Sequence, residues 1–255
     1  MLKHIKFNDL GKANHGWLKA NHHFSFAHYY NPARMGFGTL RVVNDDWVAA
    51  GKGFDPHPHR NMEIITFVRS GEISHQDNAG HTGVTKAGEV QVMSAGSGII
   101  HSEYNLSEQD LTLFQIWIQT NKHNVNPRWE SKPFNQGFSD QQLPLLVSGY
   151  SGDHNVIENK PLFIHQHARI YAGKITKGTQ LTQPITHQAY VLASQGEFKI
   201  IELPLTDSAT EHTENKADLQ AQVTLQKGDA AEITQTQSIM LEALADSEIV
   251  IIDAP

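Results

Sequence analysis

Cysteine is absent from the 255 residues of this chain, which excludes disulfide bonds and thiolate metal sites. His, Asp and Glu are therefore the available metal ligands, and the chain has 16 histidines. Long apolar runs are also absent: no stretch approaches the ~20 residues that a membrane-spanning helix needs. The first residues lack the apolar segment of a signal peptide, so we expect a cytoplasmic protein.

Dense groups of Lys and Arg are missing as well, and the formal net charge is −7. Proteins that bind nucleic acids usually carry a basic stripe, so we expect no direct contact with nucleic acid, and none with membranes. A small molecule is the expected partner. With 39% hydrophobic and 18% charged residues, the chain can form one large β-rich unit or two compact domains.

Short runs rich in β-branched and aromatic residues alternate with glycine-bearing turns from about residue 36 to residue 119. This pattern is typical of an antiparallel barrel or sandwich. No convincing amphipathic period of 3.6 residues interrupts these runs, so we expect helix to be a minor component. The run 66–77, "TFVRSGEISHQD", predicts a hairpin closed at Ser70 and Gly71.

A polar connector at 120–144 separates this region from a second series of strand-like runs. The second series repeats the cadence of the first, for example "SQGE" against "SGE" and "QKGD" against "KAGE". A weak repeat of domain length predicts two similar β domains in tandem, at 1–130 and 131–255. The polar tract 206–220 is expected to form a mobile loop.

Two pairs of potential metal ligands have the spacing of residues on one face of a strand. His57 and His59 are two apart, and so are His101 and Glu103. Side chains at i and i+2 point the same way from a strand, and a barrel could bring the two pairs together. Three imidazoles and a carboxylate suit Fe(II), Mn, Co, Ni or Cu, with positions left for water or substrate.

The segments that contain these pairs resemble the two motifs of cupin proteins. The first is "GKGFDPHPHRNMEIITFVRSG" and the second "GEVQVMSAGSGIIHSEYN". Together with "FSFAHYYNPARMGFGTLRVVNDD", "EISHQDNAGHTG" and "NPRWE", they resemble the pirin family over roughly residues 12 to 130. The remainder resembles that family in its two-domain layout. The resemblance implies an all-β bicupin, with two tandem cupin barrels of the jelly-roll type.

The resemblance also implies which carboxylate binds the metal. In ordinary cupins the Glu of the first motif is a ligand, which here would be Glu63. In pirins the carboxylate comes from the second motif, so we assign His57, His59, His101 and Glu103. Glu63 is then expected to be a hydrogen-bonded wall residue. The implied cofactor is one divalent transition metal, Fe(II) as first choice, with Mn, Co, Ni, Cu or Zn as alternatives.

Other polar residues near the motifs are candidates for contacts with substrate or with the metal ligands. His75 could bond to a ligand or to a neighbouring loop, and Gln115 interrupts an apolar strand, which suggests a group that points into a cavity. Glu63 belongs to the same set. His165 and His167 form another pair in the second half, but no "HSE" segment follows them, and pirin-like second domains are expected to be metal-free. We interpret this pair as structural.

The activity that the resemblance implies is that of a quercetin 2,3-dioxygenase, which cleaves a flavonol or a related enol with O2. Glu103 is the expected catalytic base. The alternative is a metal-dependent binding or regulatory protein of the pirin type, which acts through protein partners. A sugar isomerase would need Lys or Arg beside the metal to hold a phosphate, and none stands out near the motifs.

Overall fold

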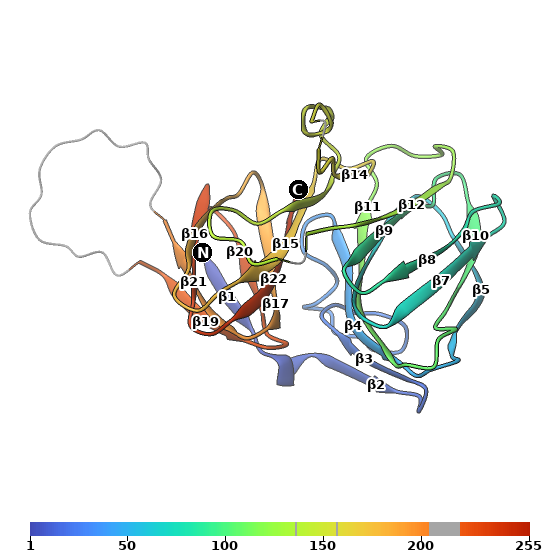
Figure 1. Ribbon diagram of the computed structural model, residues 1–255, viewed down its shortest axis with the longest axis horizontal. Helices are drawn as coiled ribbons and strands as arrows, with labels where there is room; N and C mark the ends of the chain where they lie inside the picture. Colours follow the sequence, from blue (N-terminus) through green and yellow to red (C-terminus); the bar gives the residue numbers. More distant parts are fainter. Residues whose placement is uncertain (136, 157, 204–219) are drawn as a thin grey trace, which may run out of the picture. The chain divides into compact units, whose positions relative to one another are not determined.

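The computed structural model describes residues 1–135, 137–156, 158–203 and 220–255. Its regular structure is almost all strand (Figure 1), and the helices of the described residues are the short 3-10 segments η1 (Phe7–Asp9) and η2 (Ser151–His154). The predicted all-β class with little helix is therefore confirmed. No described helix has the length and apolar character to cross a membrane. The loop expected at 206–220 lies, except for residue 220, outside the described residues.

The chain divides into two compact units that are interleaved in sequence. The first unit contains Asp9–Gln136 and Leu145–Arg169, and the second contains Met1–Asn8, Gly137–Pro144 and Ile170–Pro255. The N-terminal strand belongs to the second unit because it pairs antiparallel with a late strand, with Leu2 opposite Ile233. The division into domains at residue 130 stays a prediction; these units differ from it in the segments 1–8, 131–136 and 145–169.

The first unit consists of two antiparallel sheets that face each other, in strand orders β12-β9-β6-β11-β4-β3-β2 and β5-β10-β7-β8. The parallel pair β13–β14 completes this unit. The strands are β2 (Gly11–Asn14), β3 (Leu18–His22), β4 (Leu40–Val48), β5 (Gly53–His59), β6 (Met62–Ser70), β7 (Glu72–Asp77), β8 (Thr82–Lys86), β9 (Glu89–Ser94), β10 (Ile99–Tyr104), β11 (Leu111–Gln119), β12 (Arg128–Pro133), β13 (Leu145–Ser148) and β14 (Leu162–Phe163).

The second unit repeats this two-sheet arrangement, with strand orders β1-β20-β17-β22-β15 and β16-β21-β18-β19. A continuous apolar core that includes Phe198, Ile200 and Ile251 lies between its sheets. The strands are β1 (Leu2–Ile5), β15 (Arg169–Ile175), β16 (Gln180–Pro184), β17 (Gln188–Gln195), β18 (Glu197–Glu202), β19 (Gln222–Gln226), β20 (Ala230–Ile233), β21 (Ser238–Ala243) and β22 (Ser247–Ala254).

The predicted hairpin at Ser70 and Gly71 is wrong in its pairing, although the turn is where we expected it. Strand β6 ends at Ser70, Gly71 has a φ of 73°, and β7 begins at Glu72. However, β6 pairs with β9 and β11, whereas β7 pairs with β8 and β10. The turn therefore carries the chain from one sheet to the other, which a local turn signal cannot distinguish from a hairpin.

The interior of the first unit is apolar in some places and polar in others. Two buried apolar groups, one around Leu113 and one around Met93, fill part of it. Between them, Thr66 of β6 lies opposite Gln91 of β9 and Gln115 of β11. Buried polar groups cost free energy unless they are hydrogen bonded, so a polar patch inside a barrel indicates that these side chains serve one another or a ligand.

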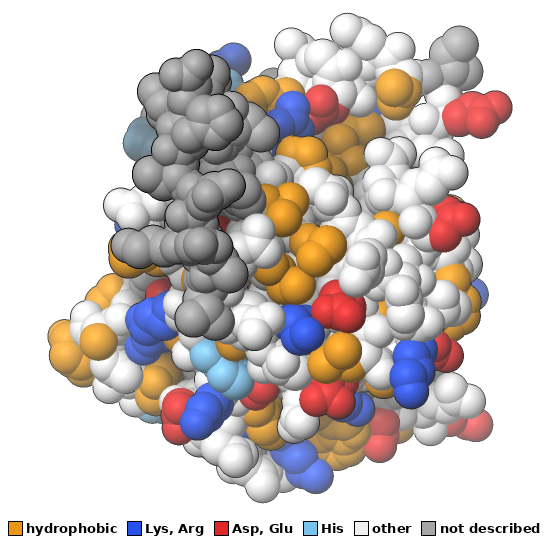
Figure 2. All heavy atoms as spheres, turned by 90° about the vertical axis from the view of Figure 1, so that its left-hand side faces the viewer, with side chains coloured by type: hydrophobic (Ala, Val, Ile, Leu, Met, Phe, Trp, Pro, Cys, Tyr) orange, Lys and Arg blue, Asp and Glu red, His pale blue; other side chains and the backbone are white. Residues whose placement is uncertain are grey.

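Charged side chains of both signs share the surface. On the face drawn in Figure 2, Lys and Arg lie among Asp and Glu, and apolar side chains are scattered between them. The expectation that the chain does not bind nucleic acid stays a prediction.

Gly53 lets β5 and β10 come close together beside the predicted ligands. A Cβ at this position would lie 2.3 Å from the backbone oxygen of Glu103 and 2.5 Å from the Cα of Tyr104. We therefore expect Gly53→Ala to lower the free energy of unfolding by about 1–3 kcal/mol, as overpacking usually does. Urea unfolding measures it. Gly152→Ala is the matched control, because its Cβ would meet nothing within 4 Å; equal stability of the two variants would contradict this account.

Candidate metal centre

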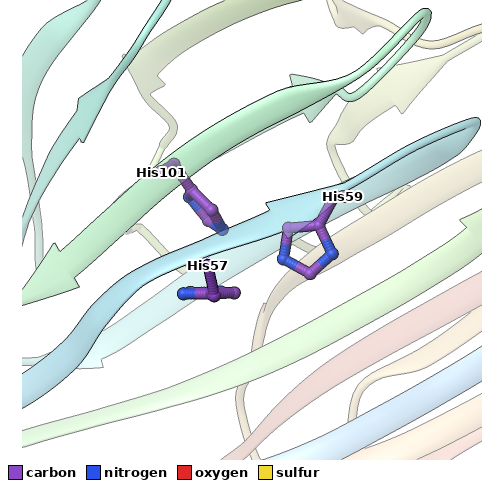
Figure 3. A group of neighbouring side chains, drawn as sticks. All are labelled: His57, His59 and His101. Atoms are coloured by element: carbon purple, nitrogen blue, oxygen red, sulfur yellow. The ribbon is translucent and has the colours of Figure 1, made fainter.

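The predicted histidines come from two neighbouring strands and point into one space (Figure 3). His57 and His59 lie on β5, and the residue between them, Pro58, points away, as strand alternation requires. His101 on β10 lies directly opposite His57. Between His101 and Glu103 the partner on β5 moves from His57 to Phe54, so β5 carries one extra residue there and the pairing is irregular at the site.

The three imidazole rings are within contact distance of one another. Ring centroids are 4.8 Å apart for His57 and His59, 4.4 Å for His57 and His101, and 4.9 Å for His59 and His101. One potential ligand atom from each lies within 4.8 Å of the others. A second group, formed by His75, His101 and Glu103, meets the same limit. The two groups share His101, so together they form one cluster of His and Glu side chains.

The nitrogen atoms of this cluster fit a divalent metal. His101 Nε2 is buried and has no hydrogen-bond partner, which is costly for a polar atom unless a ligand fills the space. His57 Nδ1 donates to the backbone oxygen of Asp55 at 2.7 Å, which leaves Nε2 with the free lone pair. Burial lowers the pKa of His59 to about 4 and that of His101 to about 2, so both rings are neutral near pH 7.

Glu103 lies at the end of a hydrogen-bond network that has one consistent direction. Trp129 Nε1, which can only donate, donates to Gln91 Oε1 at 3.2 Å. Gln91 Nε2 therefore faces Glu103 Oε1, to which it donates at 2.6 Å, and it also donates to Thr66 Oγ1. Thr66 in turn donates to Gln115 Oε1, and Gln115 Nε2 donates to Glu103 Oε2 at 3.0 Å.

This network holds both oxygens of Glu103 as acceptors, which favours the ionised carboxylate. Burial acts in the opposite direction and is the stronger effect, so the pKa of Glu103 rises to about 7 despite the bonds from Gln91 and Gln115. Near neutral pH the group can therefore take up or release a proton. A nearby cation would favour its ionised form.

Comparison with known proteins shows the family of this chain. Residues 5–118 match the family model described as Pirin, and residues 155–254 match one described as the quercetinase C-terminal cupin domain. A pirin-like protein of Caulobacter vibrioides is 42% identical, with 100% of both chains covered. A quercetin 2,3-dioxygenase of Escherichia coli K12 is 37% identical, with 98% of this chain and 97% of the relative covered. The chain belongs to the pirin family.

A solved structure confirms the predicted bicupin fold of this pirin-family protein. The crystal structure of bacterial pirin YhhW from Escherichia coli, in complex with nickel(II), superposes with a TM-score of 0.83. It is 36% identical, and the match covers 100% of this chain and 99% of that one. The predicted tandem of two cupin barrels is therefore correct, and a relative with the same fold is known in complex with a divalent metal.

The other predicted residues lie in three different environments. His75 is buried, with Nδ1 3.4 Å from His101 Nδ1 and its ring stacked on Trp129. Gln115 donates to Glu103, so it points into the interior. Glu63 is fully buried and precedes Ile64 on β6, where Ile64 lies opposite Trp117 of β11. Thr66 is three residues further along the strand, so strand alternation directs Glu63 and Thr66 to opposite faces of the sheet.

Glu63 is hydrogen bonded on that opposite face. Ser94 Oγ donates to its Oε2 at 2.6 Å. Burial, the largest effect, raises the pKa of Glu63 above its ordinary value although the bond from Ser94 lowers it. The side chain is thus part of the wall behind the site, and the first cupin motif alone does not indicate this because it does not reveal the face of the strand.

The second histidine pair lies elsewhere in the first unit. His165 packs edge-on against Phe163, with 4.8 Å between ring centroids, and His167 stacks on Tyr150 at 5.4 Å. In the part of the chain that the structure describes, the groups able to hold a metal are the two that share His101. The interpretation of this pair as structural stays a prediction.

Sequence reasoning missed two residues that surround the cluster. Gln91 orients Glu103, and Asp77 bonds to His75 at 3.0 Å. Trp117 also lies beside the cluster, where it packs edge-on against His59 with 4.8 Å between ring centroids. Gln91 carried a usable signal, because it is a polar residue within the apolar run "EVQVM". The sequence signal for Asp77 was weaker: it lies two residues from His75 in the same strand.

The raised pKa of Glu103 predicts how metal affinity depends on pH. A metal must displace the proton of Glu103, which is bound below pH 7 and lost above it. Below pH 7 we expect the nickel(II) affinity of the native protein to fall more steeply with decreasing pH than that of Glu103→Gln. The difference between the two should grow about tenfold per pH unit. Above pH 7 the two curves should run parallel. Calorimetric titrations over this range measure both, and parallel curves throughout would contradict the prediction.

Proposed function

We propose that His57, His59, His101 and Glu103 bind one divalent transition metal in this pirin-family protein. The observation that carries the proposal is the unpartnered, buried Nε2 of His101, which lies in a cluster with two further imidazoles and a carboxylate. Fe(II) is the expected native ion, and Mn, Co, Ni, Cu and Zn accept the same ligands. The nickel(II) complex of the related YhhW supports binding of a divalent ion.

We further propose that the protein is a dioxygenase of the quercetin 2,3-dioxygenase type. A bound divalent metal supplies a Lewis acid that lowers the pKa of a substrate hydroxyl. Glu103 accepts the proton of that hydroxyl, because a carboxylate that binds the metal lies close to a substrate hydroxyl bound at the same metal. The resulting enolate is electron-rich enough to react with O2, and ring cleavage of a flavonol then gives a depside and carbon monoxide. The names of relatives such as the Escherichia coli protein support this reaction.

The walls beside the histidines suit a flat aromatic substrate. Trp117 stands edge-on to His59, and Phe26 stands edge-on to Trp117 with 5.4 Å between ring centroids. The indole Nε1 of Trp117 is buried and without a hydrogen-bond partner, so it can donate to a substrate oxygen. Aromatic side chains beside a few polar groups are typical of sites for small aromatic molecules.

The metal assignment predicts the effect of removing one ligand. His101→Ala should retain a small fraction of the metal that the native protein binds, because the buried ligand is lost and no polar group nearby replaces it. His165→Ala is the control, and its metal content should equal that of the native protein. Elemental analysis after loading with each ion gives both values. Loss of metal in the control, with metal retained in His101→Ala, would place the metal at the other pair.

The proposed base predicts a separate effect on turnover. In Glu103→Gln an amide oxygen can still face the metal, but the proton acceptor is gone. We expect flavonol turnover, measured as O2 uptake at saturating metal, to fall by a factor on the order of 10²–10⁴. Glu63→Gln also removes a buried carboxylate, but on the other face of the sheet, and should keep its turnover within about twofold. The reverse result would make Glu63 the base.

No O2 uptake by the fully metal-loaded native protein, with any of the six ions and with quercetin as the flavonol, would contradict the dioxygenase. That outcome would favour the metal-dependent binding protein as the function. The metal content of the same sample shows whether the metal assignment still stands, because it is measured independently of turnover.

A further inference from the structure

Three buried side chains form a hydrogen-bonded series that ends at His101, whose other ring nitrogen has no partner. Asp77 Oδ2 is 3.0 Å from His75 Nε2, and His75 Nδ1 is 3.4 Å from His101 Nδ1. Strands β7 and β10 are neighbours, and their register places His101 opposite Asp77 and Glu103 opposite His75. The series therefore approaches the metal cluster from the side of β7, behind His101.

The proton positions along this series follow from Asp77. Its carboxylate accepts from the backbone N–H groups of Ala79 and His81 at 2.9 and 3.0 Å, and the ring of His81 adds a contact at 2.9 Å. Burial raises the pKa of Asp77, but the bonds from His75 and His81 outweigh it and hold the pKa below its ordinary value. An ionised carboxylate can only accept, so His75 Nε2 carries a proton and donates it.

His75 then determines the tautomer of His101. Two facing Nδ1 atoms make a hydrogen bond only if one accepts, and a neutral His75 that keeps its proton on Nε2 has its lone pair on Nδ1. That lone pair faces His101 Nδ1, which must therefore be the protonated nitrogen. The remaining nitrogen, His101 Nε2, keeps its lone pair, and it is the buried atom without a partner. Both imidazoles therefore donate in the direction of Asp77, and the lone pair of His101 Nε2 is left for the metal cluster.

We propose that Asp77 and His75 are positioning residues that fix His101 in the tautomer able to bind a metal through Nε2 and make that nitrogen a stronger donor. The proposal rests on the metal centre proposed above. His57 offers a contrast within the same cluster, since its Nδ1 donates to a neutral backbone carbonyl, that of Asp55. A carboxylate behind a ligating histidine raises the basicity of the ligand and orients its ring. Here the effect passes through an intervening imidazole.

Asp77→Asn tests this direction with little change in shape. The side-chain oxygen of Asn can keep the bonds from the N–H groups of Ala79 and His81, so its NH2 group faces His75. His75 Nε2 must then accept, which moves its proton to Nδ1. His101 Nδ1 must accept in turn, so the proton of His101 moves to Nε2, the nitrogen that would bind the metal.

Two measurements read this out, and neither is activity. In apoprotein with 15N-labelled histidine, long-range 1H–15N spectra should show protonated Nδ1 at His101 and protonated Nε2 at His75. Both assignments should be reversed in Asp77→Asn. Calorimetric titration with nickel(II) should show an affinity about 10–100-fold lower in this variant, the usual effect of removing a group that orients a ligand.

Further variants provide controls on the same strand. Gln76→Ala changes the exposed residue between His75 and Asp77 and should bind nickel(II) within about twofold of the native protein. His75→Phe keeps a ring that can stack on Trp129, as His75 does at 5.1 Å, but leaves His101 Nδ1 without its acceptor. Its nickel(II) affinity should fall as well, which keeps the test available if Asp77→Asn does not fold.

The inference is overturned if the native apoprotein carries the proton of His101 on Nε2. It is also overturned if folded Asp77→Asn or folded His75→Phe binds nickel(II) as tightly as the native protein. Native protein with the stated tautomers and nickel(II) binding, but without flavonol turnover, would contradict the proposed dioxygenase and still support these positioning roles. Loss of turnover in Asp77→Asn with native tautomers and affinity would contradict the positioning roles alone.

Discussion

The close pairing of β5 with β10 is the constraint on which the rest of this site depends. It places His57 opposite His101, and it tolerates no side chain at Gly53, where a Cβ would meet the backbone of the other strand. Neither strand carries a complete ligand set, so the cluster exists only while the two are in register. Strand β10 keeps a regular register with β7, so Glu103 extends from the same face of β10 as His101. A defect in this pairing would therefore disturb fold and metal centre together.

Hydrogen bonding inside the first unit is directional because groups that can only donate or only accept stand at its ends. The indole N–H of Trp129 fixes Gln91, and through it Thr66 and Gln115, so that Glu103 receives two donors. On the β7 side, the Asp77 carboxylate fixes His75. Both networks converge on atoms of the same cluster. Buried polar groups are expensive unless every one is satisfied, and in this barrel their arrangement also decides where the free lone pairs lie.

The predictions from sequence succeeded where strand parity or a motif carried the information. The spacing of two in "HPH" and in "HSE" indicated shared faces, and the structure brings the three histidines together. The hairpin at Ser70 and Gly71 failed because a turn signal does not say which strands pair. The role of Glu63 stayed open because the first motif supplies a carboxylate that could bind a metal but does not show which face of β6 carries it. In the structure, its position on β6 directs it away from Thr66. Gln91 was missed because its partners lie on other strands, and Asp77 because the role of its partner His75 depends on His101 of another strand.

By itself, the sequence determined the all-β class, the pirin resemblance and the residue types available to a metal. Those properties are local: they depend on composition, on the period of two along a strand and on short motifs. Only the tertiary structure decided which strands are neighbours, which face Glu63 occupies and which nitrogen of His101 is free. These depend on register between strands far apart in the chain, and a shift by one residue would exchange the interior face for the exterior one.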